Sequence, residues 1–300
     1  MEIYYFSGTG NCLAVARVVA EKTNAKLISI PTVIDQQSVK TDADMIGIVF
    51  PAYLAPLWGI PLIVEDFLRK LENIESKYLF AICTCGGYEI VNALPPLKNL
   101  AKLIQSIGGK LSAEYSLRLP MNNLDYDHIP VPINRDQATI FKNCNRKLDR
   151  ICKRILHGRG TKYDFWKTFF NYLMSPMYQM LRKPCLISLK KMAHENENST
   201  LGFKELIPLT DKSIRLDEKC TGCATCAKVC PVQNIEIINN KPVWRHHCQM
   251  CFACDEWCPK NAIHHWSRAD GIKYHHPNVK TQDMFSQKHR DSFVFDNKDR

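Results

Sequence analysis

Two runs of cysteines with identical spacing constrain the fold of this 300-residue chain more than any other feature of its sequence. Each run reads Cys-x2-Cys-x2-Cys-x3-Cys-Pro, and every cysteine of the first run has a counterpart 28 positions further along the chain. The sequences after the two prolines are also alike, with Asn234–Ile237 in the first half and Ala262–His265 in the second. We interpret the repeat as an internal duplication rather than a chance cluster. The runs consist of Cys220, Cys223, Cys226 and Cys230, and of Cys248, Cys251, Cys254 and Cys258.

The spacing within each run indicates iron–sulfur chemistry. Three thiolates in a tight loop, each separated from the next by two residues, can bind three corners of one cubane. This type of run implies that the fourth ligand comes from the other half. A zinc site with four cysteines uses two separated Cys-x2-Cys pairs, which is a different pattern. We therefore expect two 4Fe–4S clusters whose crossed ligands tie the two halves into one folding unit. One set is Cys220, Cys223, Cys226 and Cys258, and the other is Cys248, Cys251, Cys254 and Cys230.

At these cysteines the sequence resembles the bacterial-type two-cluster ferredoxins, over roughly residues 211–268. The resemblance implies a small α+β ferredoxin domain. Four histidines lie near the cysteines in the sequence, but both ligand sets are already complete without them. We therefore expect them to be surface or interdomain side chains. They are His246, His247, His264 and His265.

The first 150 residues alternate short apolar runs with segments of helical period. The runs 45–50 and 78–83 are continuously apolar, as in strands that are covered on both faces. The run 111–119 alternates apolar and more polar residues, which suits an edge strand. This alternation predicts an open parallel sheet of five strands with helices on both sides. The expected strands span residues 3–6, 26–30, 45–50, 78–83 and 111–119.

A loop of glycine and hydroxyl residues follows the first expected strand. Backbone N–H groups at the start of the next helix, together with the helix dipole, can bind a phosphate in such a loop. A Gly-Lys-Ser/Thr motif is absent, which excludes an ATPase P-loop, and Leu13 stands where a dinucleotide-binding G-x-G-x-x-G motif needs glycine. We expect Gly8 and Gly10 to allow close approach of the backbone to the ligand. The loop consists of Ser7, Gly8, Thr9, Gly10, Asn11 and Cys12.

Two further loops follow the third and fourth expected strands. In a sheet with the order 2-1-3-4-5, ligands bind beyond the carboxyl ends of the strands, at the switch point between the first and third strands. All three loops would meet there. Tyr53, Trp58 and Tyr88 are candidates to flank a planar ring, with packing against the protein as an equal alternative. The two loops contain Pro51, Ala52 and Tyr53, and Thr84, Cys85, Gly86, Gly87 and Tyr88.

The phosphate loop resembles that of flavodoxins, which reads Ser/Thr-x-Thr-Gly-x-Thr, and departs from it at Cys12. The resemblance covers about residues 1–150 and implies a doubly wound flavodoxin-like domain that binds FMN through the three loops. Residues 121–123 are a candidate cover for the pocket. Cys12 and Cys85 are expected to be small neutral residues. The order of the two domains resembles that of flavodoxin–ferredoxin fusion proteins of anaerobic bacteria and archaea, which are assigned to electron transport.

Residues 151–210 connect the two expected domains and hold most of the net charge of +10, with ten Lys and Arg against four Asp and Glu. Because the excess charge lies mainly in this connector, nucleic-acid binding is disfavoured. The stretch from Trp166 to Leu181 is rich in aromatic residues and methionine. We expect a helical hairpin packed within the protein, with peripheral contact to a membrane surface as the alternative. Residues 269–300 form a polar tail that we expect to be partly disordered or to lie along the surface.

Together these features predict electron transfer between FMN and two 4Fe–4S clusters, with electrons passing to or from a partner redox protein. A flavin-dependent reductase of a small molecule and an iron–sulfur redox sensor are the alternatives. No triad or pair of carboxylates marks a catalytic residue. The chain shows no secretion signal and no apolar stretch long enough to cross a bilayer, and six further cysteines are scattered. We therefore expect a cytoplasmic protein with reduced thiols.

Overall fold

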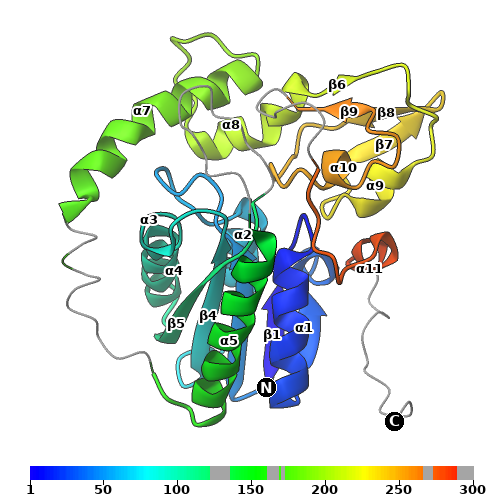
Figure 1. The fold of residues 1–300 in the computed structure, drawn as a ribbon. Helices are drawn as coiled ribbons and strands as arrows, with labels where there is room; N and C mark the ends of the chain where they lie inside the picture. Colours follow the sequence, from blue (N-terminus) through cyan, green and yellow to red (C-terminus); the bar gives the residue numbers. More distant parts are fainter. Residues whose placement is uncertain (122–135, 161–168, 170–172, 266–272, 289–300) are drawn as a thin grey trace.

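The N-terminal part of the chain folds around a five-stranded parallel sheet (Figure 1). The computed structural model describes residues 1–121, 136–160, 169, 173–265 and 273–288. The strand order is β2-β1-β3-β4-β5, which confirms the predicted flavodoxin-like topology. The strands are β1 (Glu2–Tyr5), β2 (Lys26–Ser29), β3 (Met45–Pro51), β4 (Tyr78–Cys85) and β5 (Leu111–Arg118).

The burial of the strands follows their apolar pattern. In β4 all residues after Tyr78 are buried, and in β3 the five residues between its two ends are buried, because helices cover both faces of the sheet. In β5 buried residues alternate with half-buried ones, as expected at the edge of the sheet. The continuous and the alternating patterns therefore predicted the positions of these strands within the sheet.

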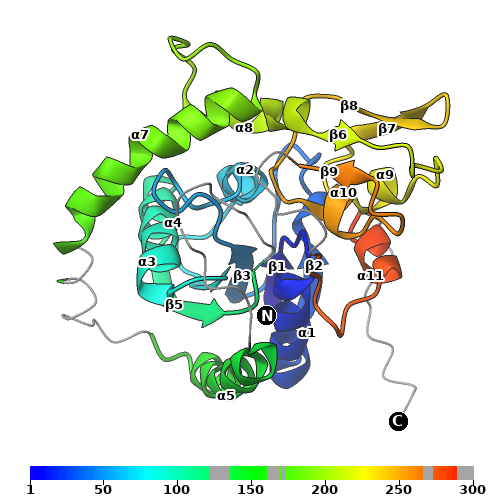
Figure 2. The same ribbon diagram turned by 45° about the horizontal axis from the view of Figure 1, so that its top comes forward.

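Two layers of helices cover the sheet (Figure 2). On one face α1 packs against α5, and on the other α2 packs against α4. One stripe of α5 is buried, namely Cys144, Leu148, Ile151, Cys152 and Ile155, which confirms the helical period seen in the sequence. This helix continues past residue 150, where we expected the first domain to end. The helices are α1 (Asn11–Thr23), α2 (Leu62–Lys70), α3 (Glu89–Asn92), α4 (Leu94–Ser106) and α5 (Gln137–Leu156), with a 3-10 turn η1 (Ile30–Thr32).

The described part of the connector forms two helices and a 3-10 turn, α7 (Ser175–Met192), α8 (Phe203–Leu209) and η2 (Thr210–Ser213). The C-terminal end of α7 and the middle of α8 share a core with the loop after β3 and with the second cysteine run. Each large apolar side chain buried in such a core contributes about 1.5–3 kcal/mol. This part of the connector therefore packs within the protein. The stretch that we expected to pack, from Trp166 to Leu181, lies partly outside the described residues, and Leu173 and Met180 within it are exposed. The helical hairpin stays a prediction. The core contains Leu57, Leu189, Met192, Ala193, Leu206, Ile207, Met250 and Phe252.

The domain that carries the cysteines shows the duplication in its backbone. Three of the first-half residues with a positive φ angle have a counterpart with positive φ 28 positions later: Gly222 and Met250, Ala224 and Phe252, Gln233 and Asn261. Met250 takes a conformation that costs a residue with a side chain about 1–2 kcal/mol. The tight loops are therefore preserved in both halves. Their elements are β6 (Arg215–Leu216), α9 (Thr225–Val229), β7 (Ile235–Ile238), β8 (Lys241–Trp244), α10 (Ala253–Glu256) and β9 (Ile263–His264).

Residues 273–288, which we call the C-terminal segment, differ from the tail that we expected. They include α11 (Thr281–Ser286), which lies beside α1 and below the cysteine domain in Figure 1. Five side chains of the segment are buried, Tyr274, His276, Val279, Met284 and Gln287. Their irregular spacing explains why the sequence shows no helical or strand period here. The rest of the expected tail lies outside the described residues.

Candidate functional site

The structure sorts the eight cysteines into two crossed groups. Cys220, Cys223, Cys226 and Cys258 line one cavity, and we call them the outer quartet. Burial first, and then the negative charges of Cys258, Cys223 and Cys220, raise the pKa of Cys226 to about 11. Each group therefore takes its fourth cysteine from the other run, as the spacing implied.

The remaining four cysteines, Cys230, Cys248, Cys251 and Cys254, form the inner quartet. Burial raises the pKa of Cys248 to about 12, and the negative charge of Cys230 adds to this effect. The pKa values of Cys251 and Cys254 are also raised, mainly by burial and further by the charges of Cys230 and Cys248. Such mutual effects require that the four sulfur atoms lie near one another.

Backbone amides stabilise the thiolates at equivalent places in the two halves. The Asn234 amide donates to the Cys230 sulfur over 3.2 Å, and the Ala262 amide donates to the Cys258 sulfur over 3.4 Å. The Met250 amide donates to Cys248 over 3.2 Å. Hydrogen bonds to the sulfur atoms are one of the means by which proteins tune iron–sulfur clusters.

The donor arrangement fits clusters better than single ions. Among the described residues, no three His, Cys, Asp or Glu side chains converge on a position that would hold one metal ion. In a 4Fe–4S cube each thiolate binds a different iron, so the sulfur atoms are spread around the cluster. A tetrahedral zinc site requires all ligands to meet at one point.

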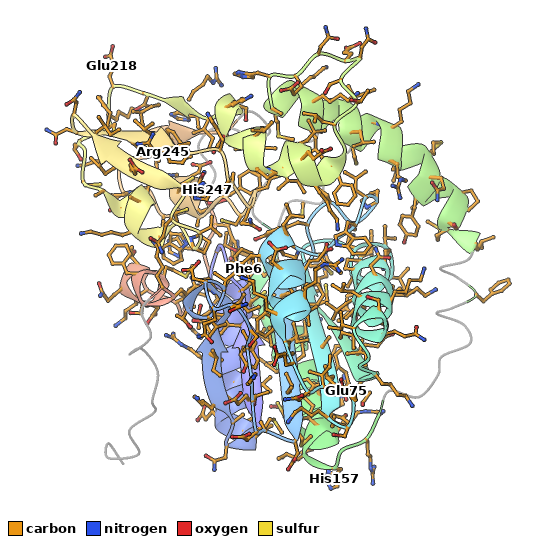
Figure 3. All side chains as sticks on the ribbon, turned by 180° about the vertical axis from the view of Figure 1, so that it is seen from behind. Phe6, Glu75, His157, Glu218, Arg245 and His247 are labelled. Atoms are coloured by element: carbon orange, nitrogen blue, oxygen red, sulfur yellow. The ribbon has the colours of Figure 1, made fainter. Side chains whose placement is uncertain are left out.

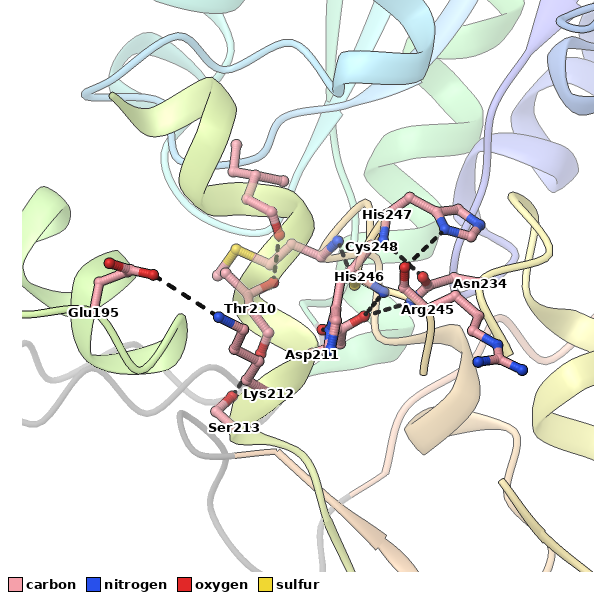
Figure 4. Close-up of polar contacts among 12 residues, drawn as sticks. Glu195, Thr210, Asp211, Lys212, Ser213, Asn234, Arg245, His246, His247 and Cys248 are labelled. Carbon is pink, nitrogen blue, oxygen red and sulfur yellow. Dashed lines mark hydrogen bonds and ion pairs between the residues drawn. The ribbon is translucent and has the colours of Figure 1, made fainter. Parts of the chain in front are cut away.

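A buried carboxylate lies beside the inner quartet (Figure 4). Asp211 is fully shielded and accepts hydrogen bonds from Asn234 Nδ2 at 2.7 Å, from the His246 amide at 3.0 Å and from His246 Nδ1 at 2.7 Å. Its negative charge also contributes to the raised pKa of Cys248, after burial and the charge of Cys230. Sequence reasoning missed Asp211, because nothing in its local sequence distinguishes it from a surface aspartate.

The four histidines near the cysteines differ in exposure, and their role as non-ligands stays a prediction. The side chains of His246 and His247 are exposed, and His264 Nε2 pairs with Asp217 at 2.9 Å. His265 is buried against the Phe252 ring, with 4.5 Å between ring centroids.

The loop Ser7–Cys12 forms the start of α1 and has the features of a phosphate cradle. The Gly10 amide donates to Ser7 Oγ at 3.1 Å, and Gly10 has a φ of +91°, which favours glycine. The backbone N–H groups of Thr9, Asn11 and Cys12 have no acceptor among the described residues. Free amides at the first turn of a helix are the groups that bind phosphate.

The same loop lies directly against the inner quartet. A Cβ atom on Gly8 would be 2.4 Å from the carbonyl oxygen of Cys251, so only glycine allows this approach. Trp257 Nε1 donates to the Gly8 carbonyl at 3.0 Å. We expected Gly8 to admit a ligand, and the structure shows that it admits the backbone of a cysteine from the other domain.

Tyr53, in the loop after β3, lies near the contact between Gly8 and Cys251. Burial raises the pKa of Tyr53, and the charges of Cys251, Cys12 and Cys248 raise it further. Pro51 and Ala52 precede it, and the Ala52 amide donates to the Thr84 carbonyl at 2.8 Å. The start of the loop after β3 is therefore bonded to the end of β4, at the edge of the sheet where both loops begin.

Thr84 and Cys85, which we expected in the loop after the fourth strand, are the last two residues of β4. The end of β4 contacts the start of α1 through Cys12 Sγ and Thr84 Oγ1 at 3.1 Å. Burial raises the pKa of both Cys12 and Cys85 to about 12, which favours the neutral thiol expected at each position. Tyr88 is 69% exposed, and the Arg118 guanidinium lies 5.8 Å from the centre of its ring.

The glycines and the other candidates near this loop have protein neighbours. A Cβ on Gly86 would meet the Met121 side chain at 2.3 Å, and one on Gly87 would meet the Asn92 amide at 2.4 Å. Trp58 packs near Phe203 of the connector, with ring centroids 6.5 Å apart. Of the expected cover at 121–123, only Met121 is among the described residues.

The C-terminal segment closes over the phosphate loop. The His276 amide donates to the Thr9 carbonyl at 2.9 Å, and the Tyr274 hydroxyl donates to Asn11 Oδ1 at 2.6 Å. A Cβ on Gly10 would lie 3.0 Å from Val279 Cβ. These contacts could not be predicted, because the sequence shows no clear helical or strand period in residues 274–279.

The model of the 4Fe-4S dicluster domain matches residues 212–259. An uncharacterized polyferredoxin-like protein of Methanocaldococcus jannaschii is 28% identical over 107 residues. That match covers 31% of this chain, and the chain spans 61% of the length of the relative.

Solved structures similar to the N-terminal part include two flavodoxins. A Streptococcus pneumoniae TIGR4 flavodoxin is 15% identical, with 50% of this chain and 97% of the flavodoxin covered and a TM-score of 0.31. Flavodoxin 1 of Bacillus cereus is 16% identical, with 49% and 96% covered and a TM-score of 0.30. An FMN-dependent NADH-azoreductase of Bacillus anthracis is 10% identical, with 52% and 98% covered and a TM-score of 0.36.

The C-terminal half thus carries an iron–sulfur domain of the dicluster class, and the strand order places a flavodoxin-like domain before it. The chain is a fusion of a flavodoxin-like domain with a 4Fe–4S ferredoxin domain. Within the described residues, no helix is both long and apolar enough to span a bilayer.

Proposed function

We propose that this protein transfers electrons between an FMN held by the N-terminal domain and two 4Fe–4S clusters held by the two quartets, and exchanges them with a partner redox protein. Flavin exchanges up to two electrons and each cluster exchanges one, so a protein that holds both converts between the two kinds of transfer. The contact between Gly8 and Cys251 carries the proposal, because it joins the candidate phosphate loop to a cluster ligand without intervening protein.

The residues of the three loops fit FMN. The free amides of Thr9, Asn11 and Cys12 suit the phosphate, and the loops after β3 and β4 begin at the same edge of the sheet. Tyr53 and Tyr88 are the proposed flanks of the ring. Thr84, Cys85, Gly86 and Gly87 would supply backbone groups to it.

The two quartets differ in their distance from these loops, which suggests an order of transfer. The inner quartet touches Gly8 and Tyr53, whereas Cys223 of the outer quartet is exposed. Figure 3 shows Phe6, which precedes the phosphate loop, at the junction of the two domains, and Glu218, next but one to Cys220, at the far edge of the molecule. We propose that the inner cluster exchanges electrons with the flavin and the outer one with the partner.

The proposal is tested with protein purified in the absence of oxygen. About eight iron atoms and one FMN per chain are expected from two cubes and one flavin site. After photoreduction of the flavin, electrons should reach the clusters at a rate that does not depend on protein concentration, because the transfer is within one chain. Loss of FMN under these conditions, or a rate proportional to protein concentration, would contradict the proposal.

A matched pair of variants locates the transfer. Gly8→Ala forces the Cys251 backbone away from the phosphate loop and should slow transfer about tenfold or more. Because Gly8 lies in the proposed FMN loop, FMN and iron contents are measured in the same sample, and the rate is taken for chains that hold both cofactors. Gly202→Ala is the control, because its Cβ would meet nothing closer than 3.6 Å.

A cytoplasmic location stays a prediction.

A further inference from the structure

A cavity of about 460 Å³ lies between the end of β5 and one side of α5. Its volume is within the range of 300–1,000 Å³ that is typical of pockets for small molecules. It is distinct from the two cysteine quartets and from the phosphate loop, because none of those residues lines it. We propose that this cavity binds a small organic anion that carries a phosphate or carboxylate group.

Positive side chains dominate the cavity. Arg118 comes from β5, and Arg146, Lys147 and Arg150 come from successive turns of α5. Because 3.6 residues make one helical turn, positions 146, 147 and 150 share one side of the helix. Guanidinium groups are well suited to phosphate and carboxylate, since their paired N–H groups bind two oxygen atoms at once.

The two carboxylates at the cavity already have partners. Glu89 pairs with Lys147 and accepts further hydrogen bonds from Ser116 Oγ at 2.5 Å and from the Arg118 amide at 3.2 Å. Asp136 caps α5 by accepting from the Thr139 amide at 2.9 Å. These bonds hold both acids in place, and among the described residues neither acid forms an ion pair with an arginine of the cavity.

The arginines have no acidic partner among the described residues. Arg146 and Arg150 form no ion pair there, and Arg150 Nε reaches only the Arg146 carbonyl at 3.4 Å. The Nε atom of Arg118 is shielded and has no acceptor among the described residues. An anion in the cavity would supply acceptors to all three.

The rest of the lining suits an organic ligand rather than a bare ion. Leu117, Ile140 and Cys144 form apolar surface, and Asn143 adds a polar group beside them. Other cations of α5, such as Lys142 and Lys153, are exposed and do not line the cavity, so they represent the ordinary solvated face of the helix. The concave, mixed lining therefore distinguishes this site from that face.

The experiment titrates the complete, cofactor-loaded protein by calorimetry at low salt with three probes. Adenosine monophosphate presents a phosphate, citrate presents carboxylates, and adenosine is the uncharged control. We expect saturable binding of at least one of the two anions and none of adenosine. Failure of both anions to bind, or equal binding of adenosine, would overturn the proposal.

Two double variants locate the binding. Arg146→Gln with Arg150→Gln should weaken the anion at least tenfold, whereas Lys142→Gln with Lys153→Gln removes the same charge outside the cavity and should change binding less than twofold. Equal losses in both double variants would overturn the proposal by showing unspecific attraction. All four side chains are exposed, so both proteins should fold, and thermal unfolding checks this.

Flavin and iron contents of the arginine variant separate this site from the proposed relay. They should equal those of the unaltered protein. A loss of FMN in the variant would mean that the arginines serve the flavin, and would overturn a separate anion site. Anion binding in protein without FMN would support the anion site while the proposed relay failed.

Discussion

The outer and inner quartets arise from one repeated sequence, yet their surroundings differ. Both use the same cysteine spacing, the same positive φ positions and the same amide-to-sulfur bond before the next strand. The outer quartet has an exposed cysteine, Cys223, whose pKa is lowered by a hydrogen bond to the Thr225 side chain. The inner quartet is enclosed by the phosphate loop, Tyr53 and Asp211. The duplicated run determines which cysteines lie together, and the neighbouring domain determines how far each quartet is buried.

The comparison is tested most strongly by removing one ligand from each quartet. Cys251→Ser should remove the inner cluster and weaken the domain contact, so that iron falls by half or more and thermal unfolding occurs at a much lower temperature. Cys223→Ser should affect only the exposed corner of the outer cluster. Iron analysis and unfolding curves measure both variants. Identical losses in the two would show that the quartets are equivalent.

The indole bond across the domains should give the next largest effect. Trp257→Phe leaves the Gly8 carbonyl without its donor, and should lower the free energy of unfolding by about 1–3 kcal/mol. Trp244→Phe is the matched control, because Trp244 Nε1 is shielded and has no acceptor among the described residues. Chemical denaturation measures both, and a larger loss at Trp244 would contradict the assignment.

The buried charge of Asp211 should separate the potentials of the two clusters. Asp211→Asn removes a negative charge beside Cys248, and reduction of the inner cluster should become easier by about 1–2 kcal/mol, or roughly 40–90 mV. Asp217→Asn is the control beside the outer quartet, where the carboxylate is partly exposed and solvent screens its charge. Redox titration followed by electron paramagnetic resonance measures both. Equal shifts of the reduction potential in the two variants would show that Asp211 does not distinguish the inner cluster from the outer one.

A smaller effect of pH is expected at the C-terminal segment. Burial lowers the pKa of His276 to about 4, below the ordinary value of 6.5. Between these values the unfolded chain binds more protons than the folded one, so stability should fall as the pH drops from about 6.5 towards 4. The loss should be on the order of 1 kcal/mol, and His276→Gln should reduce it. His157→Gln, at an exposed position, should leave the pH profile unchanged.

The sequence predicted the parts of this molecule that depend on local period or on a repeat. The strand positions followed from continuous or alternating apolar runs, and the crossed cysteine groups followed from the type of cysteine run, in which the fourth ligand comes from the other half. Contacts between distant segments could not be predicted in this way. Asp211 is an isolated acidic residue in the sequence, and only folding places it 2.7 Å from Asn234 and His246.

The contacts of Gly8 and of the C-terminal segment also could not be predicted from the sequence. Gly8 was expected in a phosphate loop, but it also contacts Cys251. The two residues are 243 positions apart in the chain, and no local pattern connects them. The buried residues of the C-terminal segment are irregularly spaced, because they fill gaps between two domains rather than one face of a helix or strand. Residues that are buried against another domain therefore show no helical or strand period in the sequence.

The C-terminal segment contacts both domains, and this restricts how the two domains move relative to each other. After the iron–sulfur domain, the C-terminal segment binds back to the N-terminal one through Arg17 and Asp283 at 2.8 Å, while Lys288 donates to the Ala227 carbonyl at 2.6 Å. A domain attached through a single linker could rotate about a hinge. Here the iron–sulfur domain is attached to the N-terminal domain both by the connector before it and by the C-terminal segment after it. If electrons pass between the two domains as we propose, tunnelling across such a fixed gap needs no diffusive search, and its rate should not change when glycerol or sucrose raises the viscosity of the solvent.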